Sequence, residues 1–208
     1  MKNIIIFDLD GVLIDSRNNM ISALKLTNKR HNLDIKFSEY ERYVGLPFKQ
    51  ILLKVGVKKN FINIKKTYSF YSNKKIKLIK FNKNVLKILK KLNTLFDLAI
   101  YTSKDKKRTY KVLGPYKKLF KIILNPEDVK KGKPNIEGLM KIKKFGKYNK
   151  ENMFYVGDSE FDYLMAKKMK IKYFHVESNY KSNKLKNKTV VIKNFNQLLK
   201  VLTKYIAV

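Results

Sequence analysis

The stretch Ile4-Ile5-Ile6-Phe7-Asp8-Leu9-Asp10-Gly11 joins an apolar run to two aspartates and a glycine. Four apolar residues without alternation predict a strand that is buried on both faces, as in a parallel sheet. Asp8 and Asp10 occupy alternate positions after this run, so in an extended chain their side chains would point the same way. Two carboxylates in one small site repel each other unless a cation or a shared proton offsets their charge. The stretch therefore predicts a charged site at the end of a buried strand.

Further apolar runs of the same character follow later in the chain. They cover residues 98–101, 121–124, 153–156, 173–176 and 189–192. Stripes of apolar residues at helical spacing lie between them, beginning near Val85, Ile136, Phe161 and Phe195. This alternation predicts a doubly wound α/β fold with a mostly parallel, Rossmann-like sheet. Ligands bind such sheets at the carboxyl ends of the strands.

Residues 17–80 break the alternation, because they contain helical patterns and no convincing buried strand. We expect a small all-helical cap inserted after the first strand. The predicted division is an α/β core of residues 1–16 and 81–208 and a cap of residues 17–80. A chain of 208 residues is long enough for one domain of ordinary size with a small insertion. The Lys- and Asn-rich residues 180–188 are interpreted as a solvated loop.

The formal net charge of +32 suggests nucleic acid as a partner. Arginine occurs only at Arg17, Arg30, Arg42 and Arg108. Binding of phosphate groups would favour arginine over lysine, and the lysines are spread along the whole chain. We therefore attribute the charge to drift toward A/T-rich codons and expect no nucleic acid partner. The charge would still concentrate anionic substrates near the protein at low salt.

Two absences from the sequence narrow the class of protein. The chain has no cysteine, which excludes disulfides, thiolate metal sites and cysteine nucleophiles. No apolar run approaches the roughly 18 residues that a membrane span needs. We expect a soluble, cytoplasmic protein with no membrane partner, either a monomer or a homodimer.

Three more polar residues follow predicted strands or a turn. Asp158 comes after residues 153–156 and Gly157, and it would face Asp8 if the two strands are neighbours. Carboxylate oxygens without histidine or cysteine form a hard site that suits Mg²⁺. Thr102 ends another strand, and Lys133 lies in the segment KKGKP of residues 130–134. A hydroxyl and an ammonium group aimed at one point can stabilise a phosphoryl group during transfer.

These polar residues lie in four segments in a fixed order. The segments are residues 8–16 (DLDGVLIDS), 99–104 (AIYTSK), 132–134 (GKP) and 157–162 (GDSEFD). Together they resemble the motifs of the haloacid dehalogenase-like (HAD) hydrolase superfamily, in the branch that includes phosphoglycolate phosphatase and β-phosphoglucomutase. The resemblance covers the whole chain. It departs from the family pattern where Ser103 replaces the usual asparagine and where Ile136 replaces a second proline.

The resemblance implies a chemical role for each of the aspartates. Asp8 would attack phosphorus and become a phospho-aspartate. Asp10 would protonate the leaving oxygen and then activate water. Mg²⁺ would bind the Asp8 carboxylate, the backbone carbonyl of Asp10 and Asp158. Asp162 would orient Lys133 or the water around the metal, although a capping box formed by Ser159 and Asp162 would explain it equally well.

The resemblance also implies how the substrate is held. Thr102, Ser103 and Lys133 would bind the phosphoryl oxygens. The cap would close over the site and exclude water. Gly45, in the segment GLP of residues 45–47, would face the substrate, and Arg42 and Lys49 are further candidate contacts; a plain turn before a helix is the alternative. Asp15 and Ser16 are interpreted as helix caps.

The expected function is hydrolysis of a small phosphorylated metabolite, phosphoglycolate-like or a sugar phosphate. A mutase of the β-phosphoglucomutase type is the alternative, but the histidine that similar mutases have in the cap is here Met20. A pyrophosphatase or a nucleotidase stays open as well. A dehalogenase has no need of a second aspartate, and Asp10 is present. The remaining alternative is a non-catalytic basic binding module, and only the high net positive charge of the chain supports it.

Overall fold

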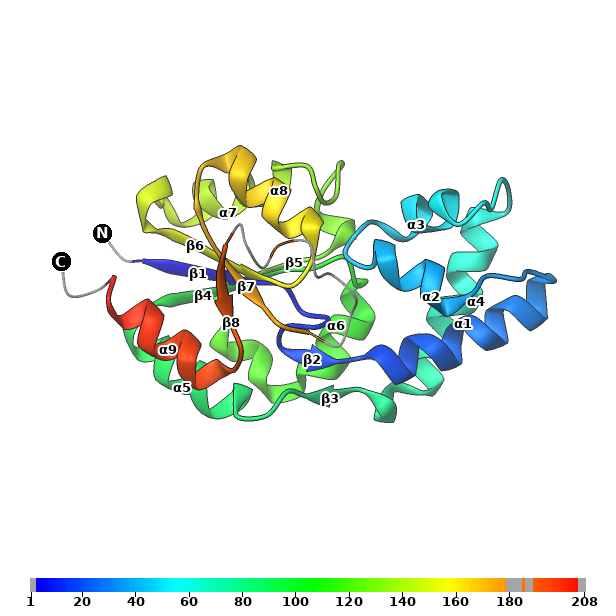
Figure 1. Cartoon of the computed structure of the whole chain (residues 1–208), viewed down its shortest axis with the longest axis horizontal. Helices are drawn as coiled ribbons and strands as arrows, with labels where there is room; N and C mark the ends of the chain where they lie inside the picture. Colours follow the sequence, from blue (N-terminus) through cyan, green and yellow to red (C-terminus); the bar gives the residue numbers. More distant parts are fainter. Residues whose placement is uncertain (1–2, 179–184, 186–188, 206–208) are drawn as a thin grey trace.

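The computed structural model describes residues 3–178, 185 and 189–205. In this part of the chain a six-stranded sheet has the order β5-β4-β1-β6-β7-β8. Its strands are β1 (Ile4–Phe7), β4 (Asp97–Tyr101), β5 (Ile122–Leu124), β6 (Met153–Gly157), β7 (Lys172–Val176) and β8 (Val190–Ile192). Every neighbouring pair is parallel. The predicted parallel sheet is confirmed, and β1 lies between β4 and β6 near its middle (Figure 1).

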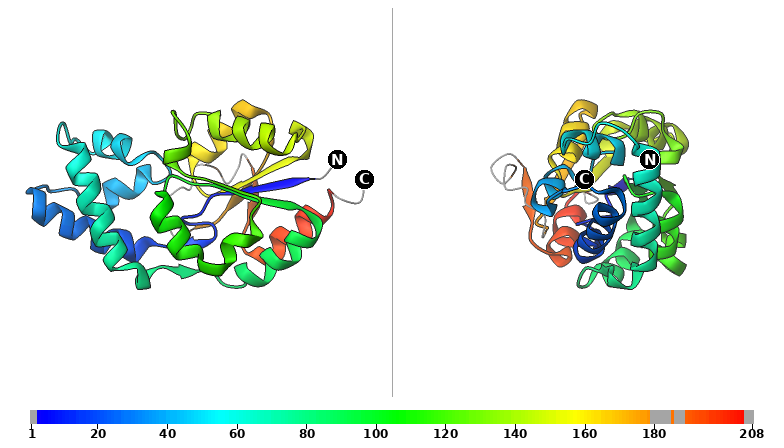
Figure 2. Two further views of the ribbon diagram at one scale, coloured as in Figure 1. Left: turned by 180° about the vertical axis from the view of Figure 1, so that it is seen from behind. Right: turned by 90° about the vertical axis from the view of Figure 1, so that its right-hand side faces the viewer.

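Helices cover both faces of this sheet. They are α5 (Val85–Leu95), α6 (Lys106–Leu113), α7 (Glu137–Gly146), α8 (Glu160–Met169) and α9 (Phe195–Thr203). Alternate residues of β1 face opposite sides: Ile5 and Phe7 pack with α5 and α9, whereas Ile4 and Ile6 pack with α7 and α8. The unbroken apolar runs follow from this arrangement, because neither face of the sheet is left to water. Figures 1 and 2 show the two helical layers on either side of the strands.

The segment between β1 and α5 forms a separate group of helices at one end of the sheet (Figure 1). They are α1 (Arg17–His31), α2 (Phe37–Tyr40), α3 (Phe48–Lys54) and α4 (Phe61–Lys74), with the 3₁₀ helices η1 (Glu41–Tyr43) and η2 (Ile76–Leu78). This group buries a hydrophobic cluster of its own, in which Leu24, Leu52 and Ile64 are almost fully buried. The expected helical cap after the first strand is therefore present.

The chain enters and leaves the cap through two segments that lie side by side. Strand β2 (Ile14–Asp15) pairs antiparallel with β3 (Lys80–Phe81). The sequence analysis did not predict this ribbon, because strands of two residues are too short to show a period. The predicted boundary at residues 16/17 lies one residue past β2 and the one at 80/81 lies within β3, and the division into two domains stays a prediction.

Short 3₁₀ helices occupy some of the remaining connections. They are η3 (Gly114–Leu119), η4 (Pro126–Asp128) and η5 (Lys150–Asn152). The predicted loop of residues 180–188 lies outside the described residues, apart from Leu185. Among the described helices, none combines the length and the apolar character needed to cross a bilayer.

Replacing Gly138 by alanine should destabilise the core. Helix α7 approaches β4 so closely that a Cβ atom at position 138 would overlap the ring of Tyr101. Overpacking of this kind costs about 1–3 kcal/mol, more than alanine recovers through its helix propensity. We expect Gly138→Ala to lower the urea midpoint of unfolding. Met140→Ala, on the exposed side of the same helix, is the control and should leave the midpoint near that of the wild type. Equal midpoints for all three proteins would show that this contact is not tight.

Candidate active site

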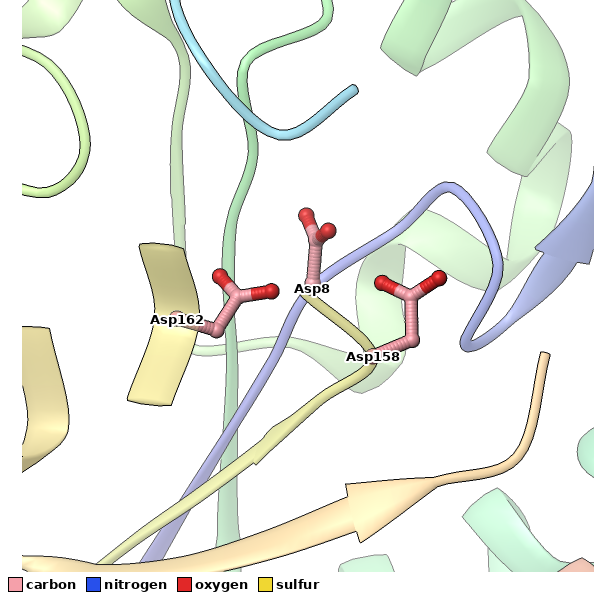
Figure 3. Close-up of side chains that lie close together, drawn as sticks. All are labelled: Asp8, Asp158 and Asp162. Atoms are coloured by element: carbon pink, nitrogen blue, oxygen red, sulfur yellow. The ribbon is translucent and has the colours of Figure 1, made fainter. Parts of the chain in front are cut away.

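Asp8 and Asp158 follow neighbouring strands, β1 and β6, at the same edge of the sheet. The register pairs Phe7 with Val156, and the amide of Asp8 donates a hydrogen bond of 2.9 Å to the carbonyl of Val156. Each of the two aspartates is only 4% exposed. Figure 3 shows Asp8, Asp158 and Asp162 with their carboxylates close together. One oxygen of each lies within 4.8 Å of the others. The expected meeting of Asp8 and Asp158 is present in the structure.

Lys133 lies between two of these carboxylates. Its Nζ is 2.9 Å from Oδ1 of Asp8 and 2.8 Å from Oδ1 of Asp162, and the lysine side chain is fully buried. The rings of Tyr101 and Tyr155 flank the ammonium group at 5.4 and 5.6 Å from their centroids. Burial by itself would lower the pKa of Lys133, but the two carboxylates outweigh burial and raise it above its ordinary value. Lys133 therefore stays charged and pairs directly with the candidate nucleophile.

Asp162 serves as a helix cap and as a partner of Lys133 at once. Its Oδ1 accepts hydrogen bonds from Lys133 and from the hydroxyl of Tyr155 at 3.0 Å. Its Oδ2 accepts from the amide and hydroxyl of Ser159, at 3.2 and 2.6 Å, and closes the capping box of α8. Both explanations that the sequence left open are present in the geometry. Both oxygens of Asp162 are thus engaged by partners within the protein.

Asp10 has a different set of partners from Asp8. Its Oδ1 accepts a short hydrogen bond from the hydroxyl of Ser16 and pairs with Nζ of Lys104 at 3.0 Å. Ser16 occupies the N-cap position of α1, as expected, although its side chain forms no capping hydrogen bond there. The first amide of the helix, that of Arg17, instead donates a hydrogen bond of 3.0 Å to Oδ1 of Asp15. Burial lowers the pKa of Lys104, and Asp10 opposes that shift. The two aspartates of the first motif are therefore paired with two different buried lysines.

The sequence analysis missed Lys104, although it lies within the second motif. Its Nζ reaches Asp10 from the end of β4, and its amide donates a hydrogen bond of 3.1 Å to the hydroxyl of Thr102. In a chain so rich in lysine, its residue type gives no signal. Only its position in the second motif, two residues after Thr102, could have indicated it.

Burial and mutual repulsion raise the pKa values of the paired carboxyl groups. Burial raises the pKa of Asp8 from 3.8 to about 7, against the lowering effect of Lys133. Burial, together with the charges of Asp8 and Asp162, raises the pKa of Asp158 well above its ordinary value. In their ionised form, the carboxylates of Asp8 and Asp158 thus need a compensating positive charge nearby. The donor set of buried carboxylates without nitrogen or sulfur fits a hard divalent cation such as Mg²⁺.

Two cavities adjoin these residues. The larger, of about 650 Å³, is lined by Thr102, Ser103 and Lys133 among others. The smaller, of about 160 Å³, lies between the cap and the core and contains Asp10. Four residues line both cavities: Pro47, Lys49, Ser103 and Pro126. Thr102 and Lys133 therefore line the larger cavity, Asp10 lines the smaller one, and Ser103 lines both.

The three cap residues expected to contact the substrate lie at different distances from the two cavities. Gly45 lines the smaller cavity, and its carbonyl accepts a hydrogen bond of 2.6 Å from the hydroxyl of Ser103. Gly45 has φ +108°, and a Cβ atom there would lie 2.8 Å from the Oγ of Ser159, so glycine is required for both reasons. Lys49 lines both cavities. Arg42 is exposed and is not among the residues that line either of these two cavities.

Comparison with known proteins agrees with this geometry. Residues 5–176 match the family model of the "Haloacid dehalogenase-like hydrolase". The chain therefore belongs to the haloacid dehalogenase-like hydrolase family. It is 29% identical over 168 residues to the "Putative pyrophosphatase PpaX" of Caldanaerobacter subterraneus subsp. tengcongensis, which covers 78% of this chain and 76% of that protein.

Solved structures show the same fold at lower identity. A predicted phosphoglycolate phosphatase from Haemophilus somnus 129PT superposes with a TM-score of 0.87 at 19% identity, covering 97% of this chain and 98% of that one. A "putative beta-phosphoglucomutase" from Thermotoga maritima superposes with a TM-score of 0.73 at 22% identity, covering 97% and 99%. This chain thus shares its fold with both structures over nearly its whole length.

Magnesium should stabilise the protein more at high pH than at low pH. The folded protein binds the proton of Asp8 more tightly than the unfolded chain does, because the pKa is about 7 when folded and 3.8 ordinarily. The free energy of unfolding of the metal-free protein therefore falls as the pH rises from about 4 to about 7. Mg²⁺ binds the ionised carboxylate and so opposes this loss at high pH. We expect the increase in Tm caused by Mg²⁺ to be several degrees larger at about pH 8 than at about pH 5.

The shift in Tm is measured by differential scanning calorimetry, and two variants test its origin. Asp158→Asn removes one of the buried carboxylates and should abolish most of the shift in Tm caused by Mg²⁺. Asp34→Asn makes the same chemical change at an exposed position of the cap and should retain the shift. A shift that is equal at both pH values, or unaffected by Asp158→Asn, would contradict the assignment of the metal site.

Proposed function

We propose that the protein is a Mg²⁺-dependent phosphatase that hydrolyses a small phosphorylated metabolite through a phospho-aspartate on Asp8. The observation that supports this most directly is the buried pairing of Asp8 with Lys133, next to Asp158. An aspartate that only ended a strand would have no need of a lysine held between two carboxylates in a buried site. Membership of the hydrolase family is consistent with this chemistry.

In the first step an oxygen of Asp8 attacks phosphorus, and the bond from phosphorus to the leaving oxygen breaks. Asp10 donates its proton to that oxygen, so the leaving group departs as an alcohol or acid. Asp10 lines the smaller cavity, and its carboxyl group is oriented by Ser16 and Lys104. In the second step Asp10 takes a proton from water, whose oxygen attacks the phospho-aspartate. This step releases inorganic phosphate and restores Asp8.

The phosphoryl oxygens are held by Thr102, Ser103 and Lys133. Positive charge and hydroxyl groups that are already in place cost little reorganisation when charge develops on these oxygens. Asp8, Asp158 and the backbone carbonyl of Asp10 would hold Mg²⁺, which offsets the negative charge of the phosphoryl group when bound. Asp162 maintains the orientation of Lys133 through its hydrogen bond of 2.8 Å.

The cap excludes water and contributes to substrate choice. Gly45 and Lys49 belong to the part of the cap that touches the cavities, and the hydroxyl of Ser103 ties the core to Gly45. Exclusion of water strengthens every electrostatic contact in the site and protects the intermediate. Arg42 stays a candidate contact for larger substrates, since it is exposed on the cap.

The alternative functions, a mutase, a nucleotidase or a pyrophosphatase, differ in how well they fit the residues and the size of the cavities. In the mutases that this chain resembles, a cap histidine occupies the position of Met20, which lines the smaller cavity and cannot transfer a proton. The smaller cavity, of about 160 Å³, lies below the roughly 300–1,000 Å³ of sites for drug-sized ligands, so a nucleoside would have to extend into the larger cavity. Pyrophosphate is small enough to fit, and the name of the PpaX relative is a reason to include it among the substrates tested.

Substitution of the two aspartates should separate their roles. Asp8→Asn should abolish hydrolysis of every phosphate compound, because the amide cannot act as the nucleophile. Asp10→Asn should retain the fold and lower kcat by about a hundredfold to ten-thousandfold, as expected for loss of a general acid and base. The measurement is release of inorganic phosphate in a screen of phosphorylated metabolites and pyrophosphate with Mg²⁺.

Asp34→Asn, with the same change in charge on the surface of the cap, is the matched control and should be as active as the wild type. Unchanged activity of Asp8→Asn would refute the proposed mechanism. Absence of turnover by the wild type on every compound would refute the proposed function and would favour a binding module.

A further inference from the structure

We propose that Tyr155 is a positioning residue of the active site: its hydroxyl fixes Asp162, and through Asp162 it holds the ammonium group of Lys133 where the phosphoryl group is transferred. This inference rests on the proposed function, because it assigns a role in the reaction that the proposed function describes. Tyr155 lies in β6, the strand that leads to Asp158, and the sequence analysis counted it only as part of an apolar run.

Lys133 depends on its partners for its position. A lysine ammonium group is a point charge on a flexible stem, so the groups around it decide where it lies. Its Nζ is 2.9 Å from Asp8 and 2.8 Å from Asp162. In the proposed reaction Asp8 forms a bond to phosphorus, and its charge then no longer holds the lysine in the same way. Asp162 is the carboxylate that can keep Lys133 in place throughout the reaction.

The carboxylate of Asp162 is itself anchored by two different elements. Its Oδ2 accepts hydrogen bonds from Ser159, within the capping box of its own helix α8. Its Oδ1 accepts from Lys133 at 2.8 Å and from the hydroxyl of Tyr155 at 3.0 Å. Without Tyr155, Oδ1 would keep no hydrogen-bond partner among the described residues except Lys133, the group whose position it sets. Tyr155 therefore supplies an anchor that is independent of the lysine.

This anchor relates Asp162 to the strands that carry the rest of the site. Tyr155 belongs to β6, and its hydroxyl also lies 3.3 Å from the backbone carbonyl oxygen of Tyr101, the residue before Thr102. A hydroxyl has a single proton, and the carboxylate is both the nearer and the stronger acceptor. A displacement of α8 relative to the sheet would break this hydrogen bond. Tyr155 thus ties the helix that holds Lys133 to the edge of the sheet where the reaction takes place.

Burial gives the side chain of Tyr155 a well-defined place. It is fully buried, and a hydroxyl in a core costs free energy unless it is hydrogen-bonded. Burial and the negative charges of Asp162 and Asp8 raise the pKa of Tyr155 well above its ordinary value, so the hydroxyl keeps its proton and acts as the donor. The centre of its ring lies 5.6 Å from Nζ of Lys133, within the range of cation–π attraction. One side chain thus contacts both members of the pair.

Tyr155→Phe tests this role, because it keeps the ring and removes the hydroxyl. We expect kcat for the best substrate of the wild type to fall about tenfold or more, as for loss of a hydrogen bond to a charged group. KM should change much less, because the contact of Lys133 with phosphoryl oxygens matters most in the transition state. The inhibition constant of orthovanadate, which takes a fifth ligand as phosphorus does during transfer, should rise by a similar factor, and that of inorganic phosphate by less.

Tyr148→Phe is the matched control. The hydroxyl of Tyr148 also donates a hydrogen bond to an aspartate, Asp97, at 2.8 Å, but Asp97 begins β4 whereas Thr102 follows its other end. Both variants lose a tyrosine–aspartate hydrogen bond and should lower Tm. Only Tyr155→Phe should lower kcat when both are assayed well below their Tm. A loss of kcat that is equal in the two variants would contradict the inference.

A double-mutant cycle tests whether Tyr155 acts through Asp162. Asp162→Asn keeps the size of the side chain and removes the charge that holds Lys133, so it should lower kcat on its own. Adding Tyr155→Phe to it should lower kcat by less than about threefold further, because the two residues act through one chain of contacts. If the two losses multiplied in full, Tyr155 would act independently of Asp162, and the inference would be wrong.

The remaining outcomes separate this inference from the proposed function. Turnover by the wild type with an equal kcat in Tyr155→Phe would overturn the inference and leave the phosphatase intact. Absence of turnover by the wild type on every phosphate compound would overturn both proposals. If Tyr155→Phe does not fold, para-aminophenylalanine at the same position takes its place, since it keeps an N–H donor there. It should retain kcat within about threefold, and a folded variant with a much lower kcat would overturn the inference.

Discussion

The contact of Lys133 with Asp8 and Asp162 is the interaction on which the rest of the site depends. Three carboxylates converge in a buried space, and without a positive charge between them their repulsion and loss of hydration would oppose folding. Lys133 supplies that charge from a loop, and α8 supplies Asp162 with its second oxygen fixed in a capping box. The order of β1 and β6 in the sheet then brings Asp158 to the same place. The folded protein thus contains a preformed cluster of carboxylates that favours binding of a further cation.

The two aspartates of the first motif acquire different chemistry from their surroundings. Asp8 faces Lys133 and the other carboxylates, whereas Asp10 faces Ser16 and Lys104 at the wall of the smaller cavity. Two aspartates two positions apart thus have different surroundings, because their partners come from different elements of the fold, and the proposed roles of nucleophile and of acid and base rest on this difference. The cap adds to this difference, because it forms part of the wall of the smaller cavity, which Asp10 lines.

Much of the fold could be predicted from the sequence because its strands are unbroken apolar runs, and the pairing of Asp8 with Asp158 followed from their place at strand ends. The residues that were missed depend on contacts between distant segments. Lys104 could not be distinguished from the many other lysines, and strands β2 and β3 were too short to show a period. The position of Ser16 at the start of a helix gave no signal of its contact with Asp10.

The most direct test of this account is to find where the phosphoryl group is attached during turnover. A single-turnover reaction with ³²P-labelled substrate and Mg²⁺, quenched in acid and followed by peptide mapping, would locate it. The account predicts label on the peptide that contains Asp8, appearing before inorganic phosphate and released by hydroxylamine as expected for an acyl phosphate. Release of inorganic phosphate at the full rate with no label on the protein, or with label on another residue, would contradict it.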